Sequence, residues 1–137
     1  MDIEFVRNVF QNDRYLVNTD VAIEEIGDNY CKCSMIISPK HLNISDVVQG
    51  GAIYTLADSA FAVASNVGHL ERSEEMVTVS QSASITYIKA IQSGILYAEG
   101  RKVGGGKKVS LYRMDVTDEQ GQIVATMNGN AYTVPKR

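Results

Sequence analysis

The segment from Gly51 to Val67, GAIYTLADSAFAVASNV, is a run of small and apolar residues that contains one charge, at Asp58. Its alanines favour a helix of about five turns. A helix that is apolar over most of its surface is normally buried by the elements around it. The rest of the chain must therefore supply a layer that covers this helix.

The charge and the glycines of this segment point to chemistry. A buried carboxylate has a raised pKa, and Asp58 is therefore a candidate general base or nucleophile. Gln49-Gly50-Gly51 stands at the helix entrance, where bare backbone N–H groups and the helix dipole favour a developing oxyanion. The alternatives are that Asp58 is a solvated helix residue and that the glycines only allow a tight turn and close packing.

The residues before this helix predict one short helix and one hairpin. Apolar residues recur at helical spacing over 3–10, which predicts an amphipathic helix that ends near residue 12. Small or apolar residues alternate with polar ones over 21–26 and 30–37, on either side of the turn signal Gly27-Asp28-Asn29. Residues 39–48 are polar and irregular, and they predict a loop that leads into the long helix.

The residues after the helix predict a run of strands. Gly68 is expected to end the helix, because glycine is the usual C-terminal stop. Four segments with period-two patterning follow, separated by turns that contain glycine: 76–89, 95–103, 109–118 and 123–135. The sequence therefore predicts the α+β class, with one domain over 1–137 in which an antiparallel sheet wraps around a central helix.

Charge and composition exclude several classes of function. The net charge is −3 and most positive residues are scattered, so a nucleic-acid partner is not expected. The N-terminus lacks the basic and apolar regions of a signal peptide, and the long helix is too short and too polar to span a membrane. We therefore expect a cytoplasmic protein without a membrane partner.

The cysteines and histidines give no sign of a metal site. Cys31 and Cys33 lie two residues apart in a predicted strand, so their side chains share one face, and the chain has no further cysteine. We interpret them as small residues of a half-buried strand. His41 and His69 are expected at the surface, and neither is a favoured base.

The segment Asn43 to Asn66, NISDVVQGGAIYTLADSAFAVASN, resembles the signature of the PaaI-type acyl-CoA thioesterases, and SQSASITYIK after it adds to the likeness. The resemblance covers nearly the whole chain in the order of its elements. It implies the hot-dog fold, hydrolysis of acyl-CoA to a free acid and coenzyme A, and no cofactor or metal beyond the coenzyme A of the substrate. It also implies a homo-oligomer, a dimer or a homotetramer, and the long strands agree because their edges need a partner.

The resemblance also implies roles for single residues. Gly50 matches the glycine whose N–H polarises the thioester carbonyl, and Asn43 matches the side chain that assists there or positions the water. Asp58 matches the general base or nucleophile, and Ser80 matches a hydroxyl that helps to hold the water. Gln49 departs from the pattern, because many relatives have histidine before the glycines. Asn43 is equally a candidate loop residue, and Ser80 a candidate strand hydroxyl.

Lys107 and Lys108 follow three glycines, Gly104 to Gly106. They are candidates for contact with a phosphate of coenzyme A beside the N–H of Gly106, or they form a solvated hairpin tip. Three other functions stay open. The chain is alternatively a non-catalytic acyl-CoA-binding protein, a hot-dog enoyl-CoA hydratase or dehydratase, or a structural domain.

Overall fold

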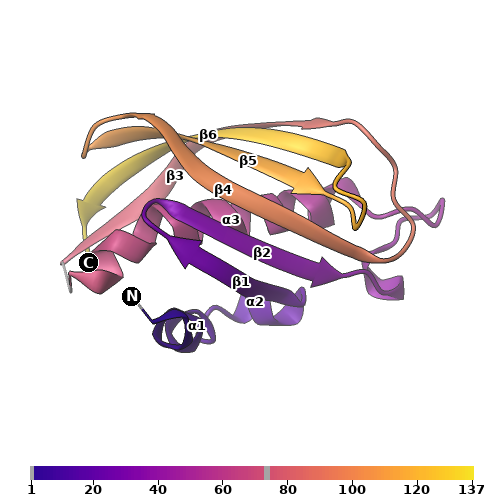
Figure 1. Ribbon diagram of the computed structural model, residues 1–137, viewed down its shortest axis with the longest axis horizontal. Coiled ribbons are helices and arrows are strands. Elements are labelled where there is room, and N and C mark those ends of the chain that lie inside the picture. Colours follow the sequence, from indigo (N-terminus) through magenta and orange to yellow (C-terminus); the bar gives the residue numbers. More distant parts are fainter. Residues whose placement is uncertain (1, 73–74) are drawn as a thin grey trace.

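One antiparallel sheet wraps around one long helix in the computed structural model, which describes residues 2–72 and 75–137 (Figure 1). The sheet has six strands in the order β1-β2-β4-β5-β6-β3. This is the hot-dog arrangement that the sequence predicts. The strands are β1 Val21–Gly27, β2 Tyr30–Ile36, β3 Met76–Tyr87, β4 Ile95–Gly105, β5 Val109–Thr117 and β6 Ile123–Pro135; the helices are α1 Ile3–Phe10, α2 Arg14–Asn18 and α3 Gly50–Glu71, with a 3₁₀ turn at Pro39–His41.

The core lies between α3 and the concave face of the sheet. Small residues on α3 let the helix come close to the strands, and Ala60 and Ala64 are fully buried there. Glycines on the strands do the same from the other side. A Cβ at Gly100 would lie 3.0 Å from the carbonyl oxygen of Ala60, and a Cβ at Gly129 would overlap the ring of Phe61. The helix therefore packs against the strand backbone itself at these two points.

The sequence predicted all six strands, and the structure adds two corrections to the helices. It adds α2, where Asp13 accepts a hydrogen bond from the N–H of Leu16 at 3.1 Å and so caps the helix. It also extends α3 by one turn beyond Gly68. Gly68 has no positive φ angle, and its carbonyl accepts from the N–H of Arg72, so it lies inside the helix instead of ending it.

Strand β3 forms one edge of the sheet and runs beside α3. Near its start, Asn66 of α3 accepts from the N–H of Thr78 at 2.8 Å and donates to the carbonyl of Thr78 at 2.9 Å. At its end, the hydroxyl of Tyr87 donates to the carbonyl of Gly50 at 2.9 Å. Strand β3 is therefore fixed to both ends of α3 and runs antiparallel to it. No helix in the described ranges is long and apolar enough to cross a membrane.

We expect Gly129→Ala to destabilise the protein, because the new methyl group would overlap Phe61 in a packed core. Overpacking of this kind costs about 1–3 kcal/mol. Gly104→Ala is the matched control, since a Cβ there meets nothing within 4 Å. Chemical denaturation of the two variants measures the difference. Equal stabilities would show that α3 can move away from β6 at no cost.

Candidate active site

The first turn of α3 offers backbone donors. The N–H groups of Ala52 and Ile53 bond to the carbonyl of Gln49 at 2.9 and 3.3 Å. Those of Gly50 and Gly51 find no acceptor in the part of the chain that the structure describes. Free N–H groups at a helix N-terminus can bind an anionic oxygen, so the entrance has the geometry expected of an oxyanion site.

Tyr87 closes one side of this entrance. Its hydroxyl donates to the carbonyl of Gly50, and a Cβ at Gly50 would lie 3.1 Å from the Cζ atom of Tyr87. A side chain at Gly50 would therefore crowd the ring of Tyr87, and glycine allows its close approach. No local sequence pattern indicates this contact, because the two residues lie 37 positions apart.

Asn43 shapes the loop before the helix. Its Oδ1 atom accepts from the N–H of Ser45 at 2.9 Å and of Val47 at 3.3 Å, and its own N–H donates to the carbonyl of Val47 at 2.8 Å. The two bonds to Oδ1 fix the orientation of the amide, and its NH₂ group has no acceptor among the described residues. Asn43 is thus a loop residue that still has donors for a substrate carbonyl.

Both histidines are bonded within the fold, and the expectation of surface histidines is wrong for His41. It is only 4% exposed; its Nδ1 accepts from the N–H of Ser38 at 3.0 Å and its Nε2 lies 3.2 Å from the carbonyl of Thr19. His69 is half-buried, with Nε2 2.8 Å from the hydroxyl of Thr78. These contacts give His41 a structural role in the loop.

Asp58 lies two turns after the glycines, about 12 Å along the helix axis. It belongs to a half-buried stripe with Tyr54 and Ala62, spaced four residues apart on one face of α3. Burial raises the pKa of Asp58 above its ordinary value, and the charge of Asp13 raises it further. A raised pKa makes the carboxylate a better proton acceptor near neutral pH.

Asp13 is a neighbour of Asp58 that sequence reasoning missed. Asp13 caps α2. That helix contacts α3 through a hydrogen bond of 3.3 Å between the hydroxyls of Tyr15 and Thr55. Thr55 lies one turn before Asp58, so α2 sits over this part of α3. An aspartate such as Asp13 is a recognisable helix N-cap in a sequence. The neighbouring residues do not indicate that its carboxylate faces Asp58.

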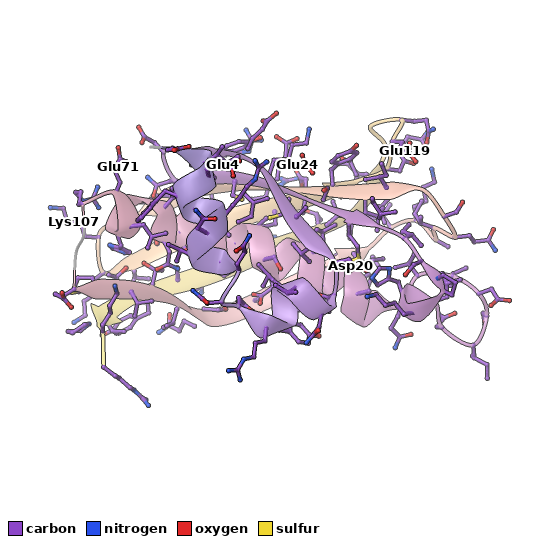
Figure 2. All side chains as sticks on the ribbon, turned by 90° about the horizontal axis from the view of Figure 1, so that it is seen from below. Glu4, Asp20, Glu24, Glu71, Lys107 and Glu119 are labelled. Carbon is purple, nitrogen blue, oxygen red and sulfur yellow. The ribbon has the colours of Figure 1, made fainter. Side chains whose placement is uncertain are left out.

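The other predicted residues lie elsewhere. Ser80 is exposed near the start of β3, seven residues or about 23 Å along the strand from Tyr87. Lys107 and Lys108 form the tip of the β4–β5 hairpin, beside the last turns of α3; Figure 2 shows Lys107 at the same end of the molecule as Glu71. A single chain therefore does not bring Ser80 or the lysines to Gly50.

Gly106 and the two cysteines have contacts within the fold. The N–H of Gly106, expected beside a phosphate, donates to the carbonyl of Val109 at 2.8 Å and is used within the hairpin. Cys31 and Cys33 share one face, as predicted, but both are fully buried, with their Sγ atoms 3.6 Å apart. Within residues 2–72 and 75–137, no group of three histidine, cysteine, aspartate or glutamate side chains is placed to hold a metal ion.

Comparison with known proteins gives the family. Residues 46–125 match the thioesterase superfamily. An inferred esterase of Archaeoglobus fulgidus is 35% identical over 127 residues, which cover 92% of this chain and 79% of the relative. The acyl-coenzyme A thioesterase PaaI of Escherichia coli is 23% identical over 127 residues, 92% of this chain and 86% of the relative. The solved structure of the E. coli PaaI protein superposes with a TM-score of 0.85 at 21% identity, covering 96% of this chain and 91% of that one.

The chain therefore belongs to the thioesterase superfamily, and it is a thioester hydrolase. Its fold and its relatives place it among the hot-dog thioesterases of the PaaI type, which confirms the resemblance found in the sequence.

We expect Asp13→Asn to shift the acid limb of the pH–activity profile to lower pH. The substitution removes the negative charge that raises the pKa of Asp58, so Asp58 ionises at lower pH. Asparagine caps helices as well as aspartate does, so α2 should keep its start. The measurement is kcat/KM for thiol release against pH. Tyr15→Phe is the control, because it removes the hydrogen bond to Thr55 without changing a charge. If the acid limb shifted equally in both variants, the cause would be the position of α2 on α3 and not the charge of Asp13.

Proposed function

We propose that this protein hydrolyses acyl-CoA to a free acid and coenzyme A, with Asp58 as the proton acceptor and the Gly50 N–H as the donor to the carbonyl oxygen. The observation that carries the proposal is the pairing, on one helix, of N–H groups without acceptors and a half-buried carboxylate whose pKa is raised. The PaaI relative, named as an acyl-coenzyme A thioesterase, supports the choice of substrate class.

In the proposed reaction, the N–H of Gly50 and the NH₂ group of Asn43 hold the thioester oxygen. Asp58 of the partner copy takes a proton from water while the water oxygen bonds to the carbonyl carbon, because Asp58 of the same chain lies about 12 Å along α3 from Gly50. The C–S bond then breaks, the acid remains, and the coenzyme A thiolate leaves and takes up a proton. An oriented N–H donor contributes about 10²–10³ to the rate and a general base about 10²–10⁴. Direct attack by Asp58, followed by hydrolysis of the anhydride, is the second form of the same proposal.

We also propose that the working enzyme is a homo-oligomer built on pairs of β3 edges. Strand β3 is a long edge strand, and the stripe of Tyr54, Asp58 and Ala62 lies half-exposed on the adjacent helix. An antiparallel β3 pair related by a two-fold axis would bring Ser80 of one copy toward the Gly50 entrance of the other. Such a dimer, alone or within a tetramer, would assemble the residues that one chain keeps apart.

Two other functions are less well supported. A hydratase or dehydratase would use an imidazole, whereas Gln49 stands at the entrance and both histidines are bonded elsewhere in the fold. A non-catalytic acyl-CoA-binding protein would not need a carboxylate with a raised pKa on the same helix as the donors. A thiol-release assay over short, medium, long and aryl acyl-CoAs separates hydrolysis from the other two functions, because only hydrolysis releases coenzyme A.

We expect Asp58→Asn to lower kcat for thiol release by at least about 10². Asp46→Asn is the matched control, since Asp46 is exposed in the loop before the helix. Wild-type turnover by a folded Asp58→Asn protein would remove Asp58 from the mechanism.

The same variant should gain stability. The fold raises the pKa of Asp58, so the folded state binds more protons than the unfolded state between the ordinary pKa of 3.8 and the raised value, and the stability of the wild type falls as pH rises through this window. Asp58→Asn avoids this cost at neutral pH, and its advantage should shrink below about pH 3.8. Thermal melts at several pH values measure the difference in stability between the variant and the wild type. If Asp58 had a structural role, Asp58→Asn would be less stable than the wild type at pH 7.

We expect Ala62→Arg to separate the copies and abolish most activity, because a long charged side chain would replace a methyl group on the proposed contact face. Gln92→Arg adds the same charge in an exposed turn and serves as control. Sedimentation velocity gives the oligomeric state. A fully active Ala62→Arg monomer would show that one chain contains the complete site.

A further inference from the structure

A pocket of about 880 Å³ lies at the end of α3 opposite to the Gly50 entrance. Gly68, which lines it, is 18 residues from Gly50, or about 27 Å along the helix. Its walls are the last turns of α3, the β4–β5 hairpin, the β1–β2 turn and the paired ends of β3 and β6. Its volume is that of a site for a small molecule of nucleotide size.

Three lysines of the hairpin line this pocket. The ammonium of Lys102 donates to the carbonyl of Gly106 at 3.3 Å, which leaves two of its three donors free. The ammonium of Lys108 lies 5.7 Å from the centre of the Tyr132 ring, and Lys107 is exposed at the tip. None of the three forms an ion pair with a described residue, and no described aspartate or glutamate lines the pocket. In a protein with a net charge of −3, this is a local concentration of positive charge.

The wall of the pocket also carries neutral donors. Ser110 is only 6% exposed, and its hydroxyl has no hydrogen-bond partner within the described ranges. Tyr112 is buried beside it and donates to the Oδ1 atom of Asn29 at 3.0 Å. The carbonyl of Asn29 accepts from the N–H of Lys102 at 3.2 Å, so the β1–β2 turn holds this wall in place. The nearly buried Ser110 hydroxyl is a donor that the fold itself leaves unused.

The end of a helix does not account for these charges. The C-terminus of α3 carries about half a negative charge from its carbonyls, which one cation would balance. Three ammonium groups exceed that need, and they come from the hairpin and not from the helix. They are therefore suited to a ligand with more than one negative charge.

We propose that this pocket binds a phosphorylated ligand of nucleotide size, with Lys102, Lys107 and Lys108 at the phosphates and Ser110 as a hydrogen-bond donor. Lysine ammonium groups and a hydroxyl are common phosphate ligands in proteins. Two sources supply this chemistry: the nucleotide end of the coenzyme A substrate, reached from a second copy of the chain, or a free nucleotide. The first source rests on the proposed function, and the second does not.

The test is calorimetric titration of the whole protein with coenzyme A, ADP and inorganic pyrophosphate at low and high salt. We expect Lys107→Gln with Lys108→Gln to weaken ADP binding by about tenfold, and added salt to weaken binding to the wild type. Ser110→Ala should weaken it without changing the salt dependence. Lys32→Gln with Arg101→Gln removes two charges from the outer face of the sheet and should leave binding as it is.

Kinetics then separate the two sources. If the substrate places its phosphates here, ADP competes with acyl-CoA in the thiol-release assay, and the Lys107/Lys108 variant raises KM more than it lowers kcat. If a free nucleotide is the ligand, ADP binds without competing. The proposal is overturned if ADP and coenzyme A do not bind, or if the lysine variant binds them unchanged and loses only thermal stability. ADP binding that depends on the lysines, in a protein without thiol release, would overturn the proposed function alone.

Discussion

Close contact between α3 and the backbone of the strands determines how this fold is packed. Alanines on the helix and glycines at 100 and 129 on the strands remove the side chains that would otherwise separate the two layers. The sheet can then curve around the helix, and nearly every strand contributes to one core. Because β3 lies at the edge, one stripe of α3 stays half-exposed, and Asp58 belongs to that stripe.

This position explains why Asp58 is suited to accept a proton. A fully buried carboxylate would be held neutral, and a solvated one would keep its ordinary pKa. Asp58 lies between these limits, and α2 adds the negative field of Asp13. The ionised state that would be used in catalysis is therefore one that the fold opposes. The ionised carboxylate lowers the stability of the folded state and would be more reactive toward protons, a combination that is common at functional sites.

Most of the fold could be predicted from the sequence, because period-two patterning and turns that contain glycine are local signals. The six strands follow these signals. The candidate site residues Gly50 and Asp58 could also be identified from the sequence, since both lie in one contiguous motif. Interactions between residues that are distant in the sequence could not be predicted. These are the interactions of Tyr87 with Gly50, of Asp13 with Asp58, and of Thr19 with the ring of His41. Gly68 shows the limit of a local rule, because glycine ends a helix only where the backbone turns to positive φ.

Each end of α3 lies beside a different set of hydrogen-bond donors, and this supports the proposed assembly. One end has free N–H groups at Gly50, and the other faces the lysines of the hairpin about 27 Å away. Strand β3 joins these ends, since Tyr87 contacts Gly50 and Thr78 is bonded to Asn66. In the proposed antiparallel pair of β3 edges, the Tyr87 end of one copy would lie beside the Thr78 end of the other. The carbonyl site of one chain and the cationic pocket of its partner would then face a single extended substrate. The proposed dimer would thus join the charge at the hairpin and the donors at the helix entrance, which one chain keeps apart.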